Sequence, residues 1–298
     1  MSHVAPFHSL ADAGYVLGEP LGRGGSSTVF RARRRDAATD IAIKLISVAD
    51  ESAAAGVLDQ YRGLAAIEQA NLVPILDVGR AGDRVYVVMP LVTTGSLSDR
   101  LRDRSRWPSP RAAVDVVRHV ADALQHLHDQ GLVHLDVKPA NVLLGDSDRP
   151  LLTDFGSSQL VGTDAVRVRG TPAYMSPEQC QLQDIGPASD QYALAVVSFL
   201  LLVGRLPFVG TSPREILQQQ VGQQPPLPRE LCPTLPGRVE RVLLIGLAKT
   251  PRERFASITA FAFALDRAVG QGSWTQASDA VSSEDPDTLQ AVTLELLI

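Results

Sequence analysis

The centre of the chain sets polar residues into apolar surroundings. The stretch LVHLDVKPANVLL carries Asp136, Lys138 and Asn141 among valines and leucines, and Asp154 follows a second apolar run further along the chain. Burying a charged group costs several kcal/mol unless the charge is paired or used. Asn141 and Asp154 offer oxygen ligands of the kind that Mg²⁺ prefers, and Asp136 could accept a proton from a hydroxyl. These residues therefore either satisfy one another structurally or form a site.

Two features nearer the N-terminus could contact phosphate. LGRGGSSTVF places Gly22, Gly24 and Gly25 between two predicted strands, whereas a dinucleotide fingerprint needs a following helix and a P-loop ends in Gly-Lys-Ser/Thr. A hairpin with glycines at its tip can still bring backbone N–H groups close to phosphates, although a plain glycine turn gives the same pattern. Lys44 is the one charge in IAIKL, which fits a functional lysine or the solvent-exposed face of a strand.

The elements that must position these residues fall into two groups. Val-, Ile- and Tyr-rich runs between Tyr15 and about Met89 predict strands, interrupted by one helix over roughly 53–68. From Ser109 the pattern becomes helical, with Pro110 near the first position of a helix that ends at Gly131. The run SDQYALAVVSFLLLVG is apolar on nearly every side, which predicts a buried helix.

Composition excludes several classes of protein. Of the 298 residues 45% are hydrophobic and 20% charged, an ordinary globular balance. The net charge of −5 gives no reason to expect nucleic acid or an anionic membrane as a partner. The two cysteines, Cys180 and Cys232, form no C-x-x-C pair and suit a reducing compartment. Neither a membrane-spanning run nor a signal peptide is evident, so we expect a cytoplasmic protein.

The motifs taken together resemble the Hanks-type serine/threonine protein kinases, and most of all their bacterial branch. GRGGSSTV, AIK, HLDVKPAN, DFG, GTPAYMSPE, SDQYALAV and RERF occur in this order between Tyr15 and about Ala268. The resemblance implies an α+β fold with a β-rich small lobe (15–91) and an α-helical large lobe (95–268). An N-terminal extension (1–14) would precede this kinase domain (15–268), and a polar tail (269–298) would follow it.

The resemblance also implies a role for each motif residue. Lys44 would hold the α- and β-phosphates of ATP, Asp136 would orient the substrate hydroxyl and accept its proton, and Lys138 would neutralise charge on the γ-phosphate. Asn141 and Asp154 would bind Mg²⁺ or Mn²⁺. Phosphoryl transfer depends mostly on such positioning and charge stabilisation.

The nucleotide site and the supporting residues follow in the same way. Val29, Ala42 and Leu143 would sandwich the adenine, Met89 would be the gatekeeper, and Pro90 would offer its carbonyl while Val92 offers an N–H. The full ATP-binding set implied is Leu21, Gly22, Gly24, Ser27, Val29, Ala42, Lys44, Met89, Pro90, Val92 and Leu143. Thr171 would contact the catalytic aspartate, Asp190 would brace the catalytic loop, and Glu178 would pair with Arg254. Lys138 and the GTPAYMSPE segment point to protein serine/threonine substrates.

Three positions depart from the family pattern. Ser27 replaces the third glycine of the phosphate loop, a mild change. Gln60 stands where a glutamate usually pairs with Lys44, and Asp59 would need rotation to substitute because it lies about 100° around the helix. Leu135 replaces the arginine that receives an activation-loop phosphate, so phosphorylation of Ser157, Ser158 or Thr163 is not expected to be the main on-switch. Arg167 and Arg169 are interpreted as a solvated basic patch rather than a phosphate site.

Two other functions remain open from the sequence. Gln60 and Ser27 would also suit a pseudokinase that binds nucleotide and acts as a scaffold, and a small-molecule kinase would share the Asp and Asn motifs. The tail from about Gln271 is either a disordered linker or a peptide that docks on the small lobe or on a regulatory partner, where it could compensate for Gln60.

Overall fold

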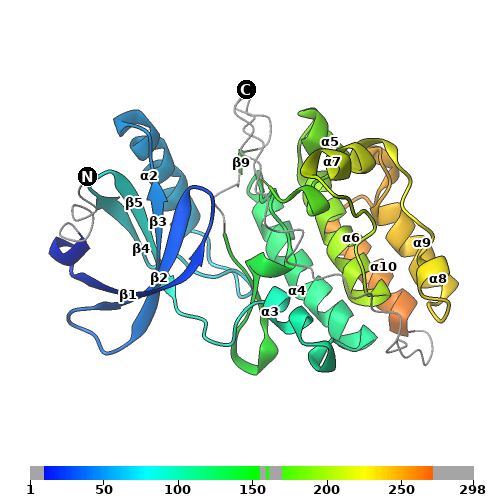
Figure 1. The fold of residues 1–298 in the computed structure, drawn as a ribbon, viewed down its shortest axis with the longest axis horizontal. Coiled ribbons are helices and arrows are strands. Elements are labelled where there is room, and N and C mark those ends of the chain that lie inside the picture. Colours follow the sequence, from blue (N-terminus) through cyan, green and yellow to red (C-terminus); the bar gives the residue numbers. More distant parts are fainter. Residues whose placement is uncertain (1–9, 155–158, 161–169, 271–298) are drawn as a thin grey trace. The chain divides into compact units, whose positions relative to one another are not determined.

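The computed structural model of the protein describes residues 10–154, 159–160 and 170–270. The chain divides into two compact units, residues 1–93 and 94–298. The first unit contains a sheet flanked by helix α2 (Glu51–Ala65), and the second is mostly helical (Figure 1). The expected α+β fold is confirmed.

The first unit is built on an antiparallel sheet in the order β1-β2-β3-β5-β4. Its strands are β1 (Tyr15–Arg23), β2 (Ser27–Arg34), β3 (Asp40–Ser47), β4 (Asp77–Ala81) and β5 (Arg84–Pro90). Strand β4, a short strand whose Gly79 pairs with Tyr86 of β5, was not among the predicted strands. The Tyr86 ring occupies the space that a Cβ at Gly79 would need, so this strand depends on a residue that strands normally disfavour.

One helix, α2 (Glu51–Ala65), packs against β4 and β5. It begins earlier than the predicted 53–68 because the Asp50 side chain caps it by accepting a hydrogen bond from Ala53 N–H at 2.8 Å. It also ends earlier, at Ala65, which leaves Ile67 outside the helix although the sequence pattern assigned Ile67 to its apolar face.

The second unit contains a series of helices and short strands. Its helices are α3 (Leu97–Arg102), α4 (Pro110–Asp129), α5 (Pro177–Gln181), α6 (Pro187–Val203), α7 (Pro213–Gly222), α8 (Pro228–Leu231), α9 (Gly237–Gly246) and α10 (Ile258–Gly270), and its strands are β6 (Leu132–Val133), β7 (Val142–Leu144), β8 (Pro150–Leu152) and β9 (Gln159–Leu160). Single 3₁₀ turns lie at Arg104–Arg106 (η1), Pro139–Asn141 (η2), Asp146–Asp148 (η3), Pro172–Tyr174 (η5) and Pro251–Glu253 (η6).

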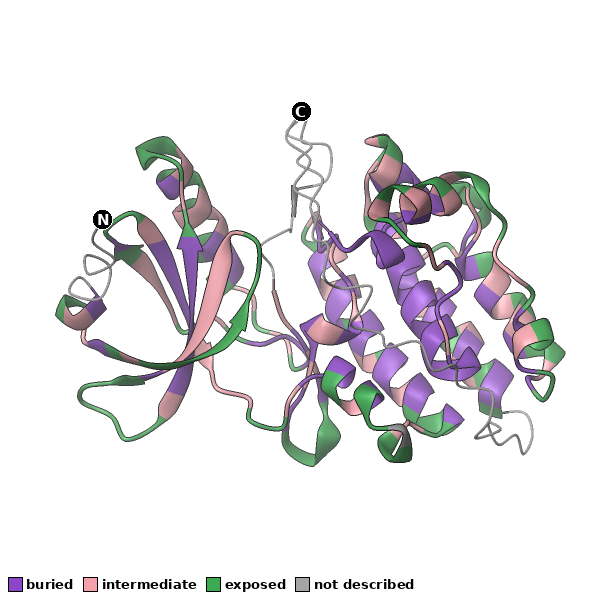
Figure 2. Ribbon diagram, in the orientation of Figure 1, coloured by how far each residue is buried: buried purple, intermediate pink, exposed green. Residues whose placement is uncertain are grey.

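Helix α6 forms the core of this unit. Every residue from Ser189 to Val203 is buried, which confirms the predicted buried helix, and Figure 2 shows this along its length. Helices α4, α9 and α10 pack against it. The predicted start and end of α4 are also confirmed: Ser109 accepts from Ala112 N–H at 3.3 Å, Pro110 is the first helical residue, and Gly131 follows with φ +73°.

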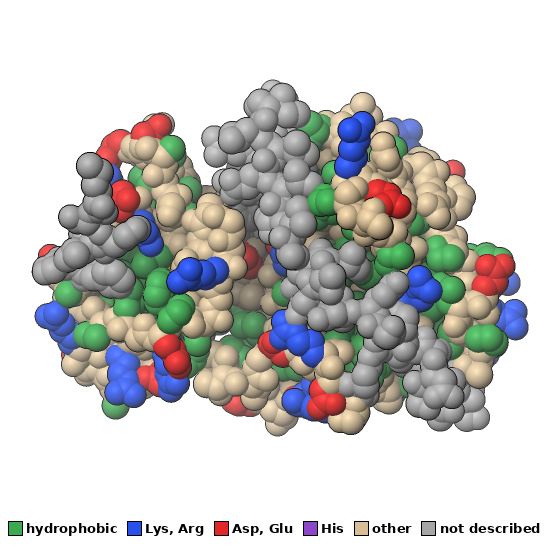
Figure 3. All heavy atoms as spheres, viewed as in Figure 1, with side chains coloured by type: hydrophobic (Ala, Val, Ile, Leu, Met, Phe, Trp, Pro, Cys, Tyr) green, Lys and Arg blue, Asp and Glu red, His purple; other side chains and the backbone are tan. Residues whose placement is uncertain are grey.

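Charges of both signs are interspersed on the face seen in Figure 3, where Lys and Arg side chains lie beside Asp and Glu side chains. The helical unit contains ion pairs such as Arg111–Asp266 and Arg100–Asp148. Within residues 10–154, 159–160 and 170–270, none of the helices combines the length and the apolar character that crossing a membrane requires.

Candidate active site

The catalytic loop follows β6 and contains a strained residue. Leu135 has φ +67°, a left-handed conformation that costs of order 1–3 kcal/mol for a bulky residue. Its side chain is buried, and Pro139 then starts the 3₁₀ turn η2 that ends at Asn141. The surrounding contacts must therefore hold this loop in place.

Asp190, in the first turn of α6, provides several of these contacts. Its carboxylate accepts hydrogen bonds from the backbone N–H groups of His134 and Leu135, each at 2.8 Å, and lies 2.8 Å from His128 Nε2. Complete burial opposes ionisation of Asp190, but the contacts with His128 and His134 outweigh it and lower the pKa of this carboxyl. The loop is thus anchored to the most buried helix of the unit.

Asp136, Lys138, Asn141 and Thr171 form one polar cluster. Lys138 Nζ lies 2.8 Å from Asp136 Oδ2 and donates to Thr171 Oγ1 at 2.8 Å. Asn141 Nδ2 donates to the Asp136 backbone O at 2.8 Å and to its Oδ2 at 2.9 Å. The direct contact between Thr171 Oγ1 and Asp136 Oδ1 is long, at 3.5 Å, so Lys138 is the closer partner of Thr171.

Asn141 and Asp154 lie at the same end of the β7–β8 hairpin. Val142 pairs with Leu152, and Thr153 N–H donates to the Asn141 backbone O at 2.9 Å. Asp154 adopts φ +67°, a second left-handed residue. Because the Asn141 amide nitrogen donates to Asp136, its amide oxygen faces no competing role and could bind a cation, as could the carboxylate of Asp154 at the same end of the hairpin. Two such oxygens fit Mg²⁺.

In the first unit, the residues expected to contact ATP share one face of the sheet. Strand register pairs Val29 with Lys44 and Ala42 with Met89, and Ala42 and Lys44 are two residues apart on β3. The opposite face of β3, with Ile41, Ile43 and Leu45, belongs to a separate apolar core that includes Leu10 and Tyr15.

Lys44 itself is buried, with 8% of its surface exposed. This excludes the alternative that it lies on the solvent-exposed face of a strand. A buried ammonium group carries a positive charge away from bulk water, where it can attract anions, which makes Lys44 a candidate for the binding of phosphates.

The remaining expected ATP-binding residues lie at the ends of strands. Gly24 follows β1, and its N–H donates to Ser27 O at 2.7 Å across the hairpin tip. Pro90 ends β5 and Val92 follows it, both half-buried. Leu21, which is 48% exposed, and the exposed Gly22 lie in β1. Leu143 lies in β7 of the second unit and is half-buried.

The helix position that replaces a glutamate is half-buried. Gln60 lies on α2 next to the buried Tyr61. Asp59 is 79% exposed and pairs with Arg62 at 3.7 Å, on a different side of the helix. In this arrangement Asp59 points away from the half-buried side of α2 that carries Gln60.

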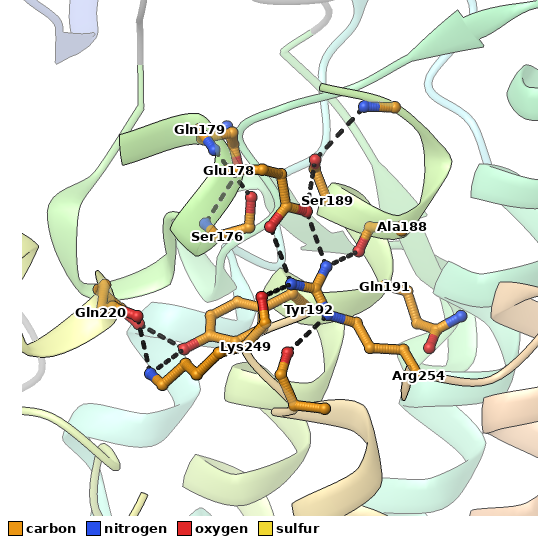
Figure 4. A network of polar contacts seen from close by, with 12 residues as sticks. Ser176, Glu178, Gln179, Ala188, Ser189, Gln191, Tyr192, Gln220, Lys249 and Arg254 are labelled. Carbon is orange, nitrogen blue, oxygen red and sulfur yellow. Dashed lines mark hydrogen bonds and ion pairs between the residues drawn. The ribbon is translucent and has the colours of Figure 1, made fainter. Parts of the chain in front are cut away.

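Figure 4 shows a polar network in the helical unit, around the ion pair of Glu178 with Arg254. Arg254 donates to both carboxylate oxygens of Glu178, at 2.7 and 2.8 Å, and to the backbone O of Ala188 at 2.7 Å. Burial alone would raise the pKa of Glu178, but Arg254 lowers it overall.

Lys249 Nζ donates to Gln220 O at 2.7 Å and lies 4.2 Å from the centre of the Phe208 ring. Burial lowers the pKa of Lys249 to about 8.

Sequence reasoning missed four residues that support the site: His128, Gln179, Gln220 and Lys249. Gln179 is 3% exposed and Gln220 is fully buried, yet both types are common on surfaces. Gln218–Gln220 is a run of three identical polar residues, so its pattern gave no sign of which one is buried. Ser157, Ser158, Thr163, Arg167 and Arg169, and the tail beyond residue 270, lie outside the described residues.

Comparison with known proteins identifies the family. The protein kinase domain family matches residues 15–257. The DNA damage-responsive serine/threonine-protein kinase RqkA of Deinococcus radiodurans is 37% identical over 257 residues, covering 83% of this chain and 38% of that protein. PknL of Mycobacterium tuberculosis is 31% identical over 259 residues (85% of this chain, 65% of PknL), and pkn2 of Myxococcus xanthus is 35% identical over 247 (78% and 29%).

The chain therefore spans less than two thirds of the length of each of these relatives. The match extends over the sheet of the first unit and most of the helices of the second. It includes the catalytic loop, the hairpin that carries Asn141 and Asp154, and the ion pair of Glu178 with Arg254. The chain belongs to the protein kinase family and is similar to its bacterial serine/threonine members.

Proposed function

We propose that the protein transfers the γ-phosphoryl group of ATP to serine and threonine hydroxyls of protein substrates, including its own. The observation that carries the proposal is the cluster of Asp136, Lys138, Asn141 and Thr171, in which the Asp136 carboxylate is fixed by two neighbours. A carboxylate held in one orientation can align a hydroxyl for attack, which is where most of the catalysis of phosphoryl transfer originates.

In the proposed reaction the substrate oxygen bonds to the γ-phosphorus while the bond from that phosphorus to the β-phosphate bridging oxygen breaks. Asp136 accepts the hydroxyl proton and releases it to water. Lys138, which lies 2.8 Å from both Asp136 and Thr171, supplies positive charge where negative charge builds up on the transferring group. The products are ADP and the phosphorylated side chain.

Asn141 and Asp154 would hold Mg²⁺ or Mn²⁺, which supplies charge neutralisation for the phosphates when it is bound. The sheet face with Val29, Ala42 and Met89 would receive the adenine, and Lys44 would hold the phosphates. The two cysteines are free, and burial raises the pKa of Cys180 to about 12, so its thiol is a poor nucleophile. Free cysteines and ATP as substrate support a cytoplasmic site of action.

The alternative of a pseudokinase scaffold is not favoured, because a scaffold has no need of a proton acceptor held as tightly as Asp136. The decisive experiment incubates radiolabelled ATP and Mg²⁺ with a generic basic protein. We expect incorporation with the wild type and its loss in Asp136→Ala, while both bind ATP. Equal incorporation in both proteins, or none in the wild type with ATP still bound, would contradict the proposal and, in the second case, favour the scaffold.

We further propose that loop phosphorylation is not the main switch. The buried apolar side chain of Leu135 offers no charge to receive a phosphate. A variant with alanine at 157, 158 and 163 should keep most of its transfer rate, and loss of activity in this triple variant would overturn the idea.

A further inference from the structure

Two buried glutamines attach the segment Gly170–Ser176 to the rest of the helical unit. Gln179 is in α5 and Gln220 is in α7, and each uses its side-chain amide to donate to backbone carbonyls. The segment carries Thr171, whose Oγ1 is 2.8 Å from Lys138 Nζ. The contacts that hold this segment therefore determine where Thr171 lies relative to Lys138.

Gln179 acts on the catalytic loop directly. Its Nε2 donates to the backbone O of Leu135 at 3.0 Å, and its Oε1 accepts from Ser176 N–H at 3.1 Å. Because Ser176 N–H can only donate and the Leu135 carbonyl can only accept, the orientation of the amide is fixed. Leu135 is the left-handed residue before Asp136, and its N–H is already held by Asp190. Both peptide groups of Leu135 thus have buried partners.

Gln220 holds the other side of the segment. Its Nε2 donates to Ala173 O at 2.8 Å and to Pro172 O at 3.2 Å, and its Oε1 accepts from Tyr192 Oη–H at 2.6 Å. The backbone O of Gln220 in turn accepts from Lys249 Nζ at 2.7 Å. The side-chain contacts use both amide hydrogens and the amide oxygen, so every polar atom of this buried side chain has a partner. Figure 4 shows Gln220 with Tyr192 and Lys249.

Together the two amide side chains order this segment, which in the family pattern is the role of the contact between the arginine and the activation-loop phosphate. Leu135 cannot bind a phosphate, so the segment after Gly170 must be ordered by other means. The amide contacts are neutral and buried, and they need no covalent modification. A glutamate of the same shape would present a second acceptor to each carbonyl instead of a donor, which leaves buried oxygens facing one another.

We propose that Gln179 and Gln220 are positioning residues that hold the Thr171 segment against the catalytic loop, so that protein substrate meets an ordered docking segment without loop phosphorylation. This rests on the proposed kinase function. The two glutamines act through Leu135, Pro172 and Ala173, and neither is required to touch ATP.

The test compares Gln220→Glu and Gln179→Glu with the control Gln219→Glu. Gln219 is on the same helix, and its Nε2 donates to Val209 O at 2.9 Å, so the control loses a bond of the same kind away from the segment. We expect kcat to fall and KM for the protein substrate to rise, about tenfold or more in kcat/KM, in the first two variants. The affinity for ATP should stay within a factor of about two in all three variants.

Hydrogen exchange provides a readout that does not depend on activity. Backbone amides in residues 170–176 should exchange faster in both test variants and at the wild-type rate in the control, at a temperature where all four proteins are folded. Unchanged exchange and unchanged kinetics would overturn the proposal. So would a parallel loss of ATP affinity and thermal stability, which indicates a merely structural role. If the wild type transfers no phosphate, the kinase function fails and exchange alone decides the positioning role.

Discussion

Individual residues carry the strain and the unusual ionisation of this protein. Leu135, directly before Asp136, and Asp154 adopt left-handed backbone conformations, which together cost a few kcal/mol. Asp190 and Gln179 offset this at Leu135 with hydrogen bonds to both of its peptide groups. Backbone strain that is held by buried partners is typical of sites whose geometry matters more than stability.

Because Lys249 is half-buried, the free energy of unfolding of the protein should rise with pH. Burial lowers the pKa of Lys249 from 10.5 to about 8, so between these values the unfolded chain binds more protons than the folded one. The free energy of unfolding should rise with pH across this window, by at most about 1.4 kcal/mol per unit from this group. Urea unfolding of wild type and Lys249→Met at pH 8 and pH 10 measures the difference. A gap between the two proteins that does not change with pH would contradict the prediction.

Replacing Gln60 by glutamate should raise the basal rate of phosphoryl transfer. A glutamate at this half-buried position would offer Lys44 a charge-assisted hydrogen bond, which is about twice as strong as one to a neutral amide. Gln60→Glu should therefore raise the basal transfer rate, measured with a generic protein substrate. The control is Asp59→Glu, which keeps a carboxylate on the exposed side that pairs with Arg62 and should leave the rate unchanged. An unchanged or lower rate in Gln60→Glu would reject this role for position 60.

At the scale of elements, α6 is both the core and the anchor of the site. Its apolar residues pack against α4, α9 and α10, and Asp190 in its first turn holds the catalytic loop. Mutations that loosen α6 should therefore affect stability and activity together.

Phenylalanines on two helices test this directly. Phe199 in α6 is fully buried, whereas Phe263 in α10 is 62% exposed. Phe199→Ala should lower the free energy of unfolding by about 3–5 kcal/mol, because it removes a large side chain from a packed core. Phe263→Ala should change it by less than about 1 kcal/mol. Chemical denaturation checks both, and equal effects would show that α6 is not the core.

For the whole molecule, buried carboxylates set the limit of stability in acid. Glu178 and Asp190 are both buried and have lowered pKa values, because their hydrogen bonds and charge partners outweigh burial. A carboxyl with a lowered pKa contributes stability above its unfolded pKa and loses it as the pH falls through the folded value. The helical unit should therefore unfold in acid as these carboxyls become protonated.

Glu178→Gln isolates one of these groups. At pH 7 the change leaves Arg254 charged, buried and without its ion pair, which should cost about 3–5 kcal/mol. Below the ordinary pKa of 4.5 the wild type loses the same contribution, so the gap between the two proteins should narrow. The control is Glu253→Gln at an exposed position, whose free energy of unfolding should match that of the wild type at both pH 7 and pH 3. A gap that is the same at pH 7 and at pH 3 would contradict this account.

The sequence by itself determined the family, because its motifs occur in a fixed order that does not depend on how the chain packs. It also determined the buried α6 and the caps of α4, since periodicity and capping residues act locally. It placed α2 less well, because Asp50 moves the start and Ile67 lies beyond the end. It missed β4, whose Gly79 is required by the ring of Tyr86 on the neighbouring strand.

Only the tertiary structure decided that Lys44 is buried, because the alternation of a strand does not say whether its second face is covered. It also selected Gln179 and Gln220, whose carbonyl partners are as far as 44 and 48 residues away in sequence. A glutamine carries no hydrophobic signal, so its burial follows from the partners that the fold brings to it. Local chemistry named the catalytic residues, and long-range packing chose the residues that hold them in place.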